Sequence, residues 1–180
     1  MLPPGHIAAG YLTGYALLKF AHPNISPAEA QQLLLWTTFF GFAPDLDSFY
    51  AFYKQGSMRA AANPNVNHRK FLSHAPVLWL IAGLLIYFFA PSVYIKYIGL
   101  ALWLGSWSHF LLDSIEYGIM WFWPFSNKVY ALKNREISYR LDEKNFFKHN
   151  WQVVVLYSKH LSFYLEILVV LSALIVFFHH

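Results

Sequence analysis

Residues 93–117 read VYIKYIGLALWLGSWSHFLLDSIEY, a long apolar stretch with ionisable residues near its end. The stretch predicts one helix, and its apolar character predicts that this helix lies in a membrane. His109 and Asp113 are four residues apart and therefore share one helix face, where both side chains can reach a single metal ion. A His–Asp hydrogen bond that packs the helix is the alternative, but ionisable side chains are rare in membrane segments without a role.

The composition of the chain indicates an integral membrane protein. Hydrophobic residues make up 57% of the 180 residues and charged residues 12%, about half the charged share usual in soluble domains. The aromatic content of 20% fits, because Trp and Tyr collect at membrane interfaces. Cysteine is absent, which excludes disulfides and thiolate ligands. We expect the lipid bilayer as partner and no nucleic acid, since membrane orientation explains the net charge of +4 better.

Apolar runs and turn residues predict an all-α fold, a polytopic membrane helical bundle with about five transmembrane helices. One integral membrane domain, residues 1–180, would contain a motif-bearing core (1–126), a polar cytoplasmic segment (127–150) and a C-terminal helix (151–180). Several helices are shorter than the ~20 residues that cross a bilayer, so some of them would sit low in the membrane. The expected helices are residues 5–20, 27–43, 76–89, 93–117 and 161–178, the last with Trp151 as an alternative start.

Local signals define the start and the end of the second helix. Residues 26–29, SPAE, form a capping box with proline at the first helical position. Pro44 lacks a backbone donor and therefore breaks or kinks the helix just before Asp45. A short amphipathic piece is expected to follow at residues 48–55.

Positive charges are distributed unevenly between the two sides of the predicted bundle. Ten of the 13 Lys and Arg residues fall on the side of the N-terminus and of both long loops. The positive-inside rule places that side in the cytoplasm. We therefore expect a multi-pass protein of the inner (cytoplasmic) membrane with a cytoplasmic N-terminus. The ten residues are Lys54, Arg59, Arg69, Lys70, Lys128, Lys133, Arg135, Arg140, Lys144 and Lys148.

Metal-capable residues gather at the cytoplasmic ends of the predicted helices. The helix limits follow from apolar runs and turn residues alone, so the grouping of the ligands at one face is independent of them. Acids and imidazoles at membrane depth are unfavourable to place, and a converging set of them predicts a site. The predicted metal ligands are His6, Asp45, Asp47, His68, His74, His109 and Asp113.

Residues 44–47, PDLD, place two carboxylates at the end of the second helix. In extended backbone, residues two apart point the same way, so Asp45 and Asp47 could bind one metal ion or bridge two. Asp47 could instead cap a following short helix. We also interpret Asp47 as a catalytic residue that bridges metals or orients a metal ligand from behind.

Residues 68–74, HRKFLSH, combine two imidazoles with two cationic side chains. Imidazole is a common metal ligand, and the planar guanidinium of Arg69 matches phosphate oxygens. We therefore predict His68 and His74 as ligands and Arg69 as a catalytic residue that binds the substrate phosphate. A basic segment that touches anionic lipid is the alternative, and we favour it for Lys70.

Three further ionisable residues are harder to assign. His6 is supported only by its position at the same face as the other ligands, because a lone histidine is more often a hydrogen-bonded structural residue. Glu116 follows Asp113 by three residues and is either a catalytic general base or an interface acid. The role of Glu166, an acid inside the last predicted helix, stays open.

The predicted ligand set exceeds what one zinc ion needs. Four histidines and three aspartates with a bridging water would serve two metal ions roughly 3.5–4 Å apart, which generate hydroxide and clamp a phosphoryl group. One or two Zn²⁺ ions are the first expectation because histidine predominates. Manganese or iron would accept the same ligands.

The order of these motifs resembles the YdjM-like family of bacterial inner-membrane proteins, and the resemblance covers about residues 1–126. The family is described as membrane-bound metal-dependent hydrolases and is linked to zinc-dependent phospholipases of the helical type. The resemblance therefore implies metal-dependent phosphoester hydrolysis without naming the substrate. Residues 127–180 carry no motif of the family. The matching residues are Pro4-Gly5-His6, PDLD at 44–47, His68-Arg69, Ser73-His74, HFLLD at 109–113, Gly118 and WPFS at 123–126.

We therefore expect a membrane-bound metal-dependent hydrolase that cleaves a phosphoester of a lipid or amphiphile with a metal-activated water. A metal-ion transporter or a metal sensor is the main alternative, although transporter sites usually lie at mid-membrane between repeats, and the sequence shows no repeat. A phosphatase that forms a covalent phosphohistidine is a third alternative, suggested by residues 106–109, SWSH, but the chain lacks the Lys/Arg motif that such enzymes carry ahead of the catalytic histidine. A small structural or partner-binding membrane protein is the last alternative, and the oligomeric state stays open.

Overall fold

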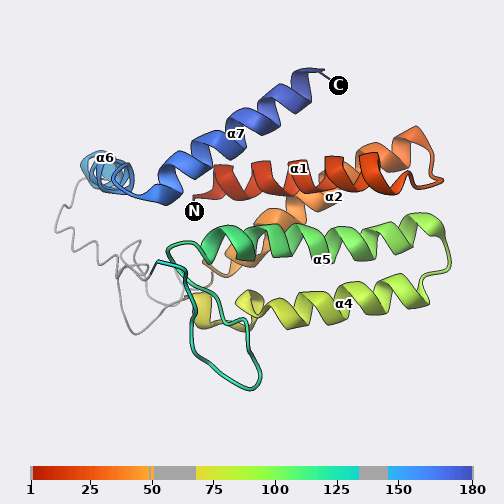
Figure 1. Ribbon diagram of the computed structural model, residues 1–180, viewed down its shortest axis with the longest axis horizontal. Coiled ribbons are helices and arrows are strands. Elements are labelled where there is room, and N and C mark those ends of the chain that lie inside the picture. Colours follow the sequence, from red (N-terminus) through yellow and green to blue (C-terminus); the bar gives the residue numbers. More distant parts are fainter. Residues whose placement is uncertain (1, 49, 51–67, 134–145, 180) are drawn as a thin grey trace.

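The structure is a computed structural model that describes residues 2–48, 50, 68–133 and 146–179 (Figure 1). Within these residues the regular structure is helical apart from one isolated bridge between Ile119 and Tyr130, so the predicted all-α fold is confirmed. The α-helices are α1 (Pro3–Ala21), α2 (Pro27–Phe42), α4 (Pro76–Phe89), α5 (Val93–Asp113), α6 (Phe146–Tyr157) and α7 (Leu161–His179). Short 3-10 helices are η1 (Ala43–Leu46), η3 (His68–Lys70) and η4 (Leu72–His74).

The helix limits agree with the local signals of the sequence, with three differences. The capping box at the start of α2 is present, and α4 has the predicted limits. The second α-helix ends at Phe42, just before Pro44 as expected, but the chain continues directly into the 3-10 helix η1, because proline is tolerated in the first turn of a new helix. The helix of 93–117 ends at Asp113 and continues as turns. The C-terminal helix is divided into α6 and α7 at residues 158–160.

Four helices form the bundle, with α1 and α2 as one antiparallel pair and α4 and α5 as another (Figure 1). Helix α5 packs against α4, α2 and α1, and α7 packs against α1. The alternating directions bring the start of α1, the end of α2, the start of α4 and the end of α5 to one end of the bundle. We call it the site end. The opposite end, with the turns at residues 22–26 and 90–92, is called the turn end.

Glycines allow three helices of the bundle to approach one another closely. A Cβ atom on Gly41 of α2 would lie 2.8 Å from both the Gly10 Cα and the His6 carbonyl oxygen of α1. A Cβ atom on Gly105 of α5 would lie 2.8 Å from the Thr37 carbonyl oxygen of α2. Small residues at such helix contacts are typical of membrane bundles. The close contact holds the first turn of α1 against α2 near the site end.

Large apolar side chains cover the outside of the bundle. Leu35 is 70% exposed, Phe89 82% and Phe178 78%. Apolar exposure on this scale indicates a surface that contacts lipid or a partner instead of water. Among the described helices, α7 is long and apolar enough by itself to cross a membrane, whereas α4 is apolar but has 14 residues. Five membrane crossings therefore stay a prediction.

The structure describes two of the predicted segments only in part. Of the amphipathic piece expected at residues 48–55, only Ser48 and Tyr50 are among the described residues. The polar segment 127–150 is described up to Lys133 and again from Phe146, where α6 begins. In Figure 1, α6 is viewed end-on beside the site end, and α7 leads away from it.

Candidate metal centre

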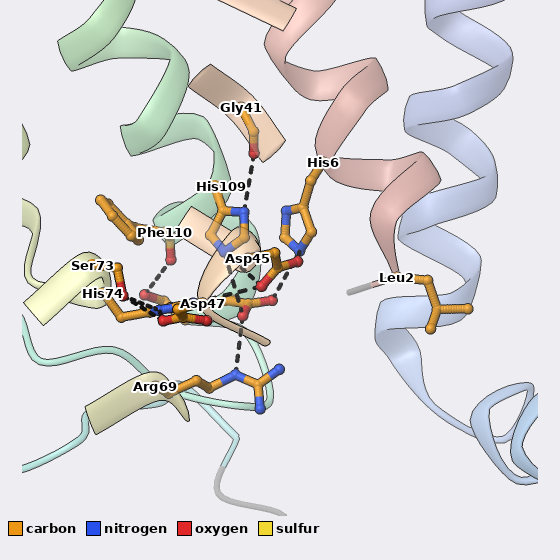
Figure 2. A network of polar contacts seen from close by, with 12 residues as sticks. Leu2, His6, Gly41, Asp45, Asp47, Arg69, Ser73, His74, His109 and Phe110 are labelled. Carbon is orange, nitrogen blue, oxygen red and sulfur yellow. Dashed lines mark hydrogen bonds and ion pairs between the residues drawn. The ribbon is translucent and has the colours of Figure 1, made fainter. Parts of the chain in front are cut away.

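Five of the seven predicted ligands meet at the site end (Figure 2). They form two groups that share one histidine, and within each group the donor atoms lie within 4.8 Å of one another. The side chains of the three histidines and of Asp113 are fully buried, whereas the Asp45 side chain is 14% exposed. The first group is His6, His109 and Asp113, and the second is Asp45, His74 and His109.

The distances between these donors fit a metal ion. Nε2 of His6 lies 3.3 Å from Oδ1 of Asp113. Nε2 of His74 and Nε2 of His109 each lie 3.6 Å from Oδ1 of Asp45. Ligands bound tetrahedrally to zinc at about 2.0–2.1 Å are roughly 3.3–3.4 Å apart. These three pairs therefore stand within a few tenths of an ångström of the separations that one ion would impose, whereas His109 Nε2 and Asp113 Oδ2 are wider apart, at 3.9 Å.

His109 is oriented for metal binding by the main chain of α2. Its Nδ1 lies 3.0 Å from the carbonyl oxygen of Gly41, which can only accept, so Nδ1 carries the proton. The other ring nitrogen, Nε2, then presents a lone pair to Asp45 and Asp113. Metal-bound histidines usually donate their second ring N–H in this way, which fixes both the tautomer and the orientation of the ring.

His74 is held in the same manner by a carboxylate. Nδ1 of His74 lies 2.9 Å from Oδ2 of Asp47, and the Ser73 hydroxyl donates to the same oxygen. Asp47 thus orients a ligand and belongs to neither donor group. The expected extended backbone at 45–47 is wrong, because η1 is helical and the C-cap residue Asp47 has φ −67° and ψ −20°. The helical turn places Asp45 and Asp47 near opposite nitrogens of one imidazole.

His6 joins the centre through its ring face and its Nε2. Its ring stacks on that of His109 with centroids 3.7 Å apart and an angle of 23° between the planes. Both ring nitrogens of His6 and Nε2 of His109 are buried without a hydrogen-bond partner among the described residues. Buried polar atoms nearly always have partners, so these nitrogens mark the place of a missing one. A metal cation is the partner that suits adjacent imidazole lone pairs.

Arg69 lies at the edge of the centre and is 18% exposed at its side chain. Its Nε donates to Oδ2 of Asp113 at 3.1 Å, and its guanidinium lies 4.4 Å from the centre of the Tyr117 ring. These contacts fix the plane of the guanidinium beside a predicted ligand. The partly exposed residues Arg69, Asp45 and Asp47 mark the side from which a molecule could approach the buried histidines.

The charges of the centre favour a cation. Burial would raise the pKa of the Asp45 carboxyl, but its hydrogen bond with His74 and the fields of His109 and His6 hold this pKa below its ordinary value. Burial would lower the pKa of the His74 imidazole, but Asp45 and Asp47 raise it above its ordinary value. The carboxylates thus stay ionised and attract positive charge, either a proton on His74 or a metal ion.

Two predicted site residues are not brought into the centre by the described structure. The side chain of His68 lies outside the described residues, although its backbone belongs to η3. Glu116 is buried, and its oxygens accept the backbone N–H groups of Leu161 (3.3 Å) and Ser162 (3.1 Å) at the start of α7. This geometry fits the interface acid and gives no support to the general base.

Two contributors to the centre were not predicted from the sequence. The Gly41 carbonyl that orients His109 is a main-chain group, and no residue type signals such a role. Ser73 was part of the 68–74 motif but received no role, although a hydroxyl next to a predicted ligand histidine is a signal for a supporting hydrogen bond.

The fold and the centre together define an all-helical membrane protein with a buried His/Asp cluster that could hold metal. A family comparison agrees with this class and makes it specific. The chain belongs to the YdjM inner membrane protein family, whose model matches residues 1–180. The resemblance found in residues 1–126 is thus confirmed and extends over α6 and α7. Neither the curated proteins nor the solved structures gave a match.

Proposed function

We propose that this chain is a membrane-bound metal-dependent hydrolase that cleaves a phosphoester of a lipid or another amphiphile. The observation that carries the proposal is the set of five converging donors, in which His109 and His74 are oriented by acceptors at Nδ1. Such pre-orientation is characteristic of metal-ligating histidines.

His6, Asp45, His74, His109 and Asp113 would hold the metal. Since Nδ1 of His109 is engaged by Gly41, its Nε2 can serve one ion only. Asp45 would be available to either group of donors, because Oδ1 faces His74 and His109 while Oδ2 faces His6. Zinc suits the ligand set best, and manganese or iron would also fit. Bound there, a divalent cation supplies Lewis-acid activation of water and of a phosphoryl oxygen.

The residues at the edge of the centre would handle the substrate. Arg69 would bind a phosphate oxygen through its guanidinium, which Asp113 and Tyr117 hold in place. Asp47 would keep His74 in the tautomer that binds metal. Glu116 receives no chemical step in this proposal, because its oxygens accept from the start of α7.

A lipid-like substrate is supported by the surroundings of the centre. The family is one of inner membrane proteins, and the outside of the bundle is apolar up to its ends. A centre at one end of such a bundle lies where phosphate headgroups lie if the helices cross the bilayer. We propose that the site end faces the cytoplasm, as the excess of Lys and Arg on that side predicts.

Activity is tested with detergent-purified protein that is stripped of metal and then reloaded with Zn²⁺ or Mn²⁺. We expect hydrolysis of phospholipid vesicles or of a synthetic phosphodiester by the reloaded protein, and none after chelation. Arg69→Ala should raise KM for the phosphoester and weaken metal binding only in part, since it removes a donor to the ligand Asp113 and no ligand itself, whereas Asp45→Ala should lose the metal. Metal binding without hydrolysis of any phosphomonoester, phosphodiester or phospholipid would contradict the hydrolase and leave a metal sensor or transporter.

Topology is tested separately, because the chain has no cysteine and single cysteines can be introduced cleanly. Asn24→Cys, at the turn end, should react with a membrane-impermeant maleimide added from the periplasmic side. Ser126→Cys, in the loop at the site end, should react only after the membrane is permeabilised. The opposite pattern would place the centre in the periplasm.

A further inference from the structure

Helix α7 contributes no donor to the centre, yet it carries a buried acid, Glu166, that the proposed chemistry does not use. Oε2 of Glu166 accepts the backbone N–H of Leu2 at 3.1 Å and the hydroxyl of Tyr157 at 2.5 Å. Oε1 accepts the backbone N–H of Gly5 at 3.3 Å. One carboxylate therefore ties α6 and α7 to the first turn of α1.

The first turn of α1 has no side-chain cap of its own, and Glu166 supplies one. The Gly5 N–H also donates to the Leu2 carbonyl oxygen at 3.1 Å, so Glu166 accepts a shared hydrogen bond from Gly5 and a separate one from Leu2. The N-cap residue is Leu2, whose side chain makes no capping hydrogen bond, and the first two helical positions are Pro3 and Pro4. The exposed N–H groups at a helix start are normally satisfied by a nearby Ser, Thr, Asp or Asn. An acid at this position also interacts favourably with the helix dipole.

The turn that Glu166 caps is the one that carries His6. Gly5 is the neighbour of His6 in the chain, and a Cβ atom on Gly5 would lie 2.8 Å from Cγ of Glu166, so the two helices touch at this point. His6 must be held firmly, because its Nε2 stands 3.3 Å from Asp113 and its ring stacks on His109. A shift of the turn by an ångström would remove His6 from the centre.

Tyr157 supports the same carboxylate. Burial and the adjacent Glu166 raise the pKa of the Tyr157 phenol, so the hydroxyl remains a donor. Three donors converge on two oxygens, and a carboxamide at position 166 could not accept from all of them, because its nitrogen is a donor.

We propose that Glu166 is a positioning residue for the metal centre, which acts by fixing the first turn of α1 and with it His6. The inference rests on the proposed metal site. It assigns to α7 a role in building the centre in addition to anchoring the chain in the membrane.

The decisive experiment is a double-mutant cycle on metal affinity with His6→Ala, Glu166→Gln and the double variant, measured by Zn²⁺ competition in detergent. Outer groups that orient ligands typically change metal affinity by roughly 10–100-fold. We expect Glu166→Gln to weaken binding by about that factor, and the double variant to bind as His6→Ala does. Independent effects that multiply in the double variant, or wild-type affinity in Glu166→Gln, would overturn the proposal.

Glu116→Gln is the matched control, since it also alters a buried capping carboxylate but one that caps α7 and not α1. It should change metal affinity far less than Glu166→Gln. Tyr157→Phe removes one donor, leaves both backbone hydrogen bonds, and should have an intermediate effect. An effect of Glu116→Gln as large as that of Glu166→Gln would indicate general loosening of the bundle and would contradict a specific role.

Hydrogen exchange tests the capping of α1 by Glu166 without requiring bound metal. In metal-free protein, the peptide that covers residues 2–12 should exchange faster in Glu166→Gln than in wild type, and at the wild-type rate in Glu116→Gln. If the wild type binds no metal, the proposed function fails while this readout still tests the capping. Unchanged exchange in Glu166→Gln would overturn the positioning role whatever the metal content.

Discussion

The two ends of the bundle are stabilised in different ways. At the turn end, helices are capped by their own sequence: Ser26 and Glu29 exchange hydrogen bonds at the start of α2, and Ser92 caps α5. At the site end, α1 begins with Leu2 and no local cap, and its N–H groups are accepted by Glu166 from α7. The caps at the turn end thus join neighbours three residues apart, whereas the cap of α1 at the site end joins residues far apart in the chain.

This difference shows that the site end depends on tertiary contacts more than the turn end does. Local caps satisfy the N–H groups at a helix start without a partner from another helix, so the turn end should tolerate change more readily. The site end exists only when α1, α2, α5 and α7 are assembled, because its acceptors and donors come from different helices. Buried polar groups are stabilising only when all of them are satisfied, so the site end should be the more sensitive of the two.

The largest effect is expected for His109→Ala, because His109 belongs to both donor groups. The variant should lose bound metal completely, as measured by elemental analysis of purified protein. His22→Ala, at the turn end, is the control and should keep the wild-type metal content. Retention of metal by His109→Ala would show that the metal does not bind at the site end.

A smaller loss is expected for Asp47→Ala, which leaves the ligands in place but removes the carboxylate 2.9 Å from Nδ1 of His74. Metal affinity should fall by roughly 10–100-fold, as is typical when the group behind a ligand histidine is removed. The measurement is Zn²⁺ competition with a chromophoric chelator. Ser73→Ala removes the donor to Asp47 and a 3.5 Å contact with Nδ1 of His74 but leaves the Asp47–His74 hydrogen bond, so it should change affinity less; a reversed order of the two variants would contradict the assigned role.

Gly41→Ala tests the packing that supports the site end. The added Cβ would lie 2.8 Å from the Gly10 Cα and from the His6 carbonyl oxygen. Forced overpacking of this kind typically lowers the free energy of unfolding by about 1–3 kcal/mol. Thermal unfolding in detergent should show the loss, together with weaker metal binding because the Gly41 carbonyl moves. A variant with wild-type stability would mean that α1 and α2 can separate without penalty.

The smallest effect on the centre is expected for Ser26→Ala at the turn end. Loss of the cap should lower the free energy of unfolding by about 1 kcal/mol, as for exposed N-caps in general. Metal content and affinity should stay at wild-type values, which distinguishes this variant from Gly41→Ala. A change in metal affinity here would show that the two ends are coupled through α2.

The sequence was sufficient for features that depend on local chemistry or on the order of apolar runs. The limits of α4 and the capping box at 26–29 follow from proline and serine signals, and both are confirmed. The meeting of His6, Asp45 and His109 follows from alternating helix directions, which apolar runs and turns predict. Such features can be predicted without knowledge of packing. Successive helices run in alternating directions, so the order of the helices decides at which end of the bundle each helix begins.

Features that depend on packing could not be predicted in this way. The helical turn at 45–47 replaces the expected extended backbone, because η1 continues from α2 through Pro44. The roles of Glu116 and Glu166 as caps involve partners 45 or more residues away, and no spacing in the sequence points to them. The same holds for the Gly41 carbonyl, since main-chain acceptors leave no trace in residue types.

The unequal lengths of the helices have a consequence for the surrounding lipid. With a rise of about 1.5 Å per residue, the 14 residues of α4 reach roughly 21 Å, and the 19 residues of α7 reach about 28 Å. A hydrocarbon layer is ~30 Å thick, so under the proposed topology thinning of the bilayer is one way to accommodate α4, whereas the bilayer next to α7 keeps nearly its normal thickness. The protein would then tilt the level of the headgroups around itself and favour membranes, or regions of a membrane, that are easily compressed.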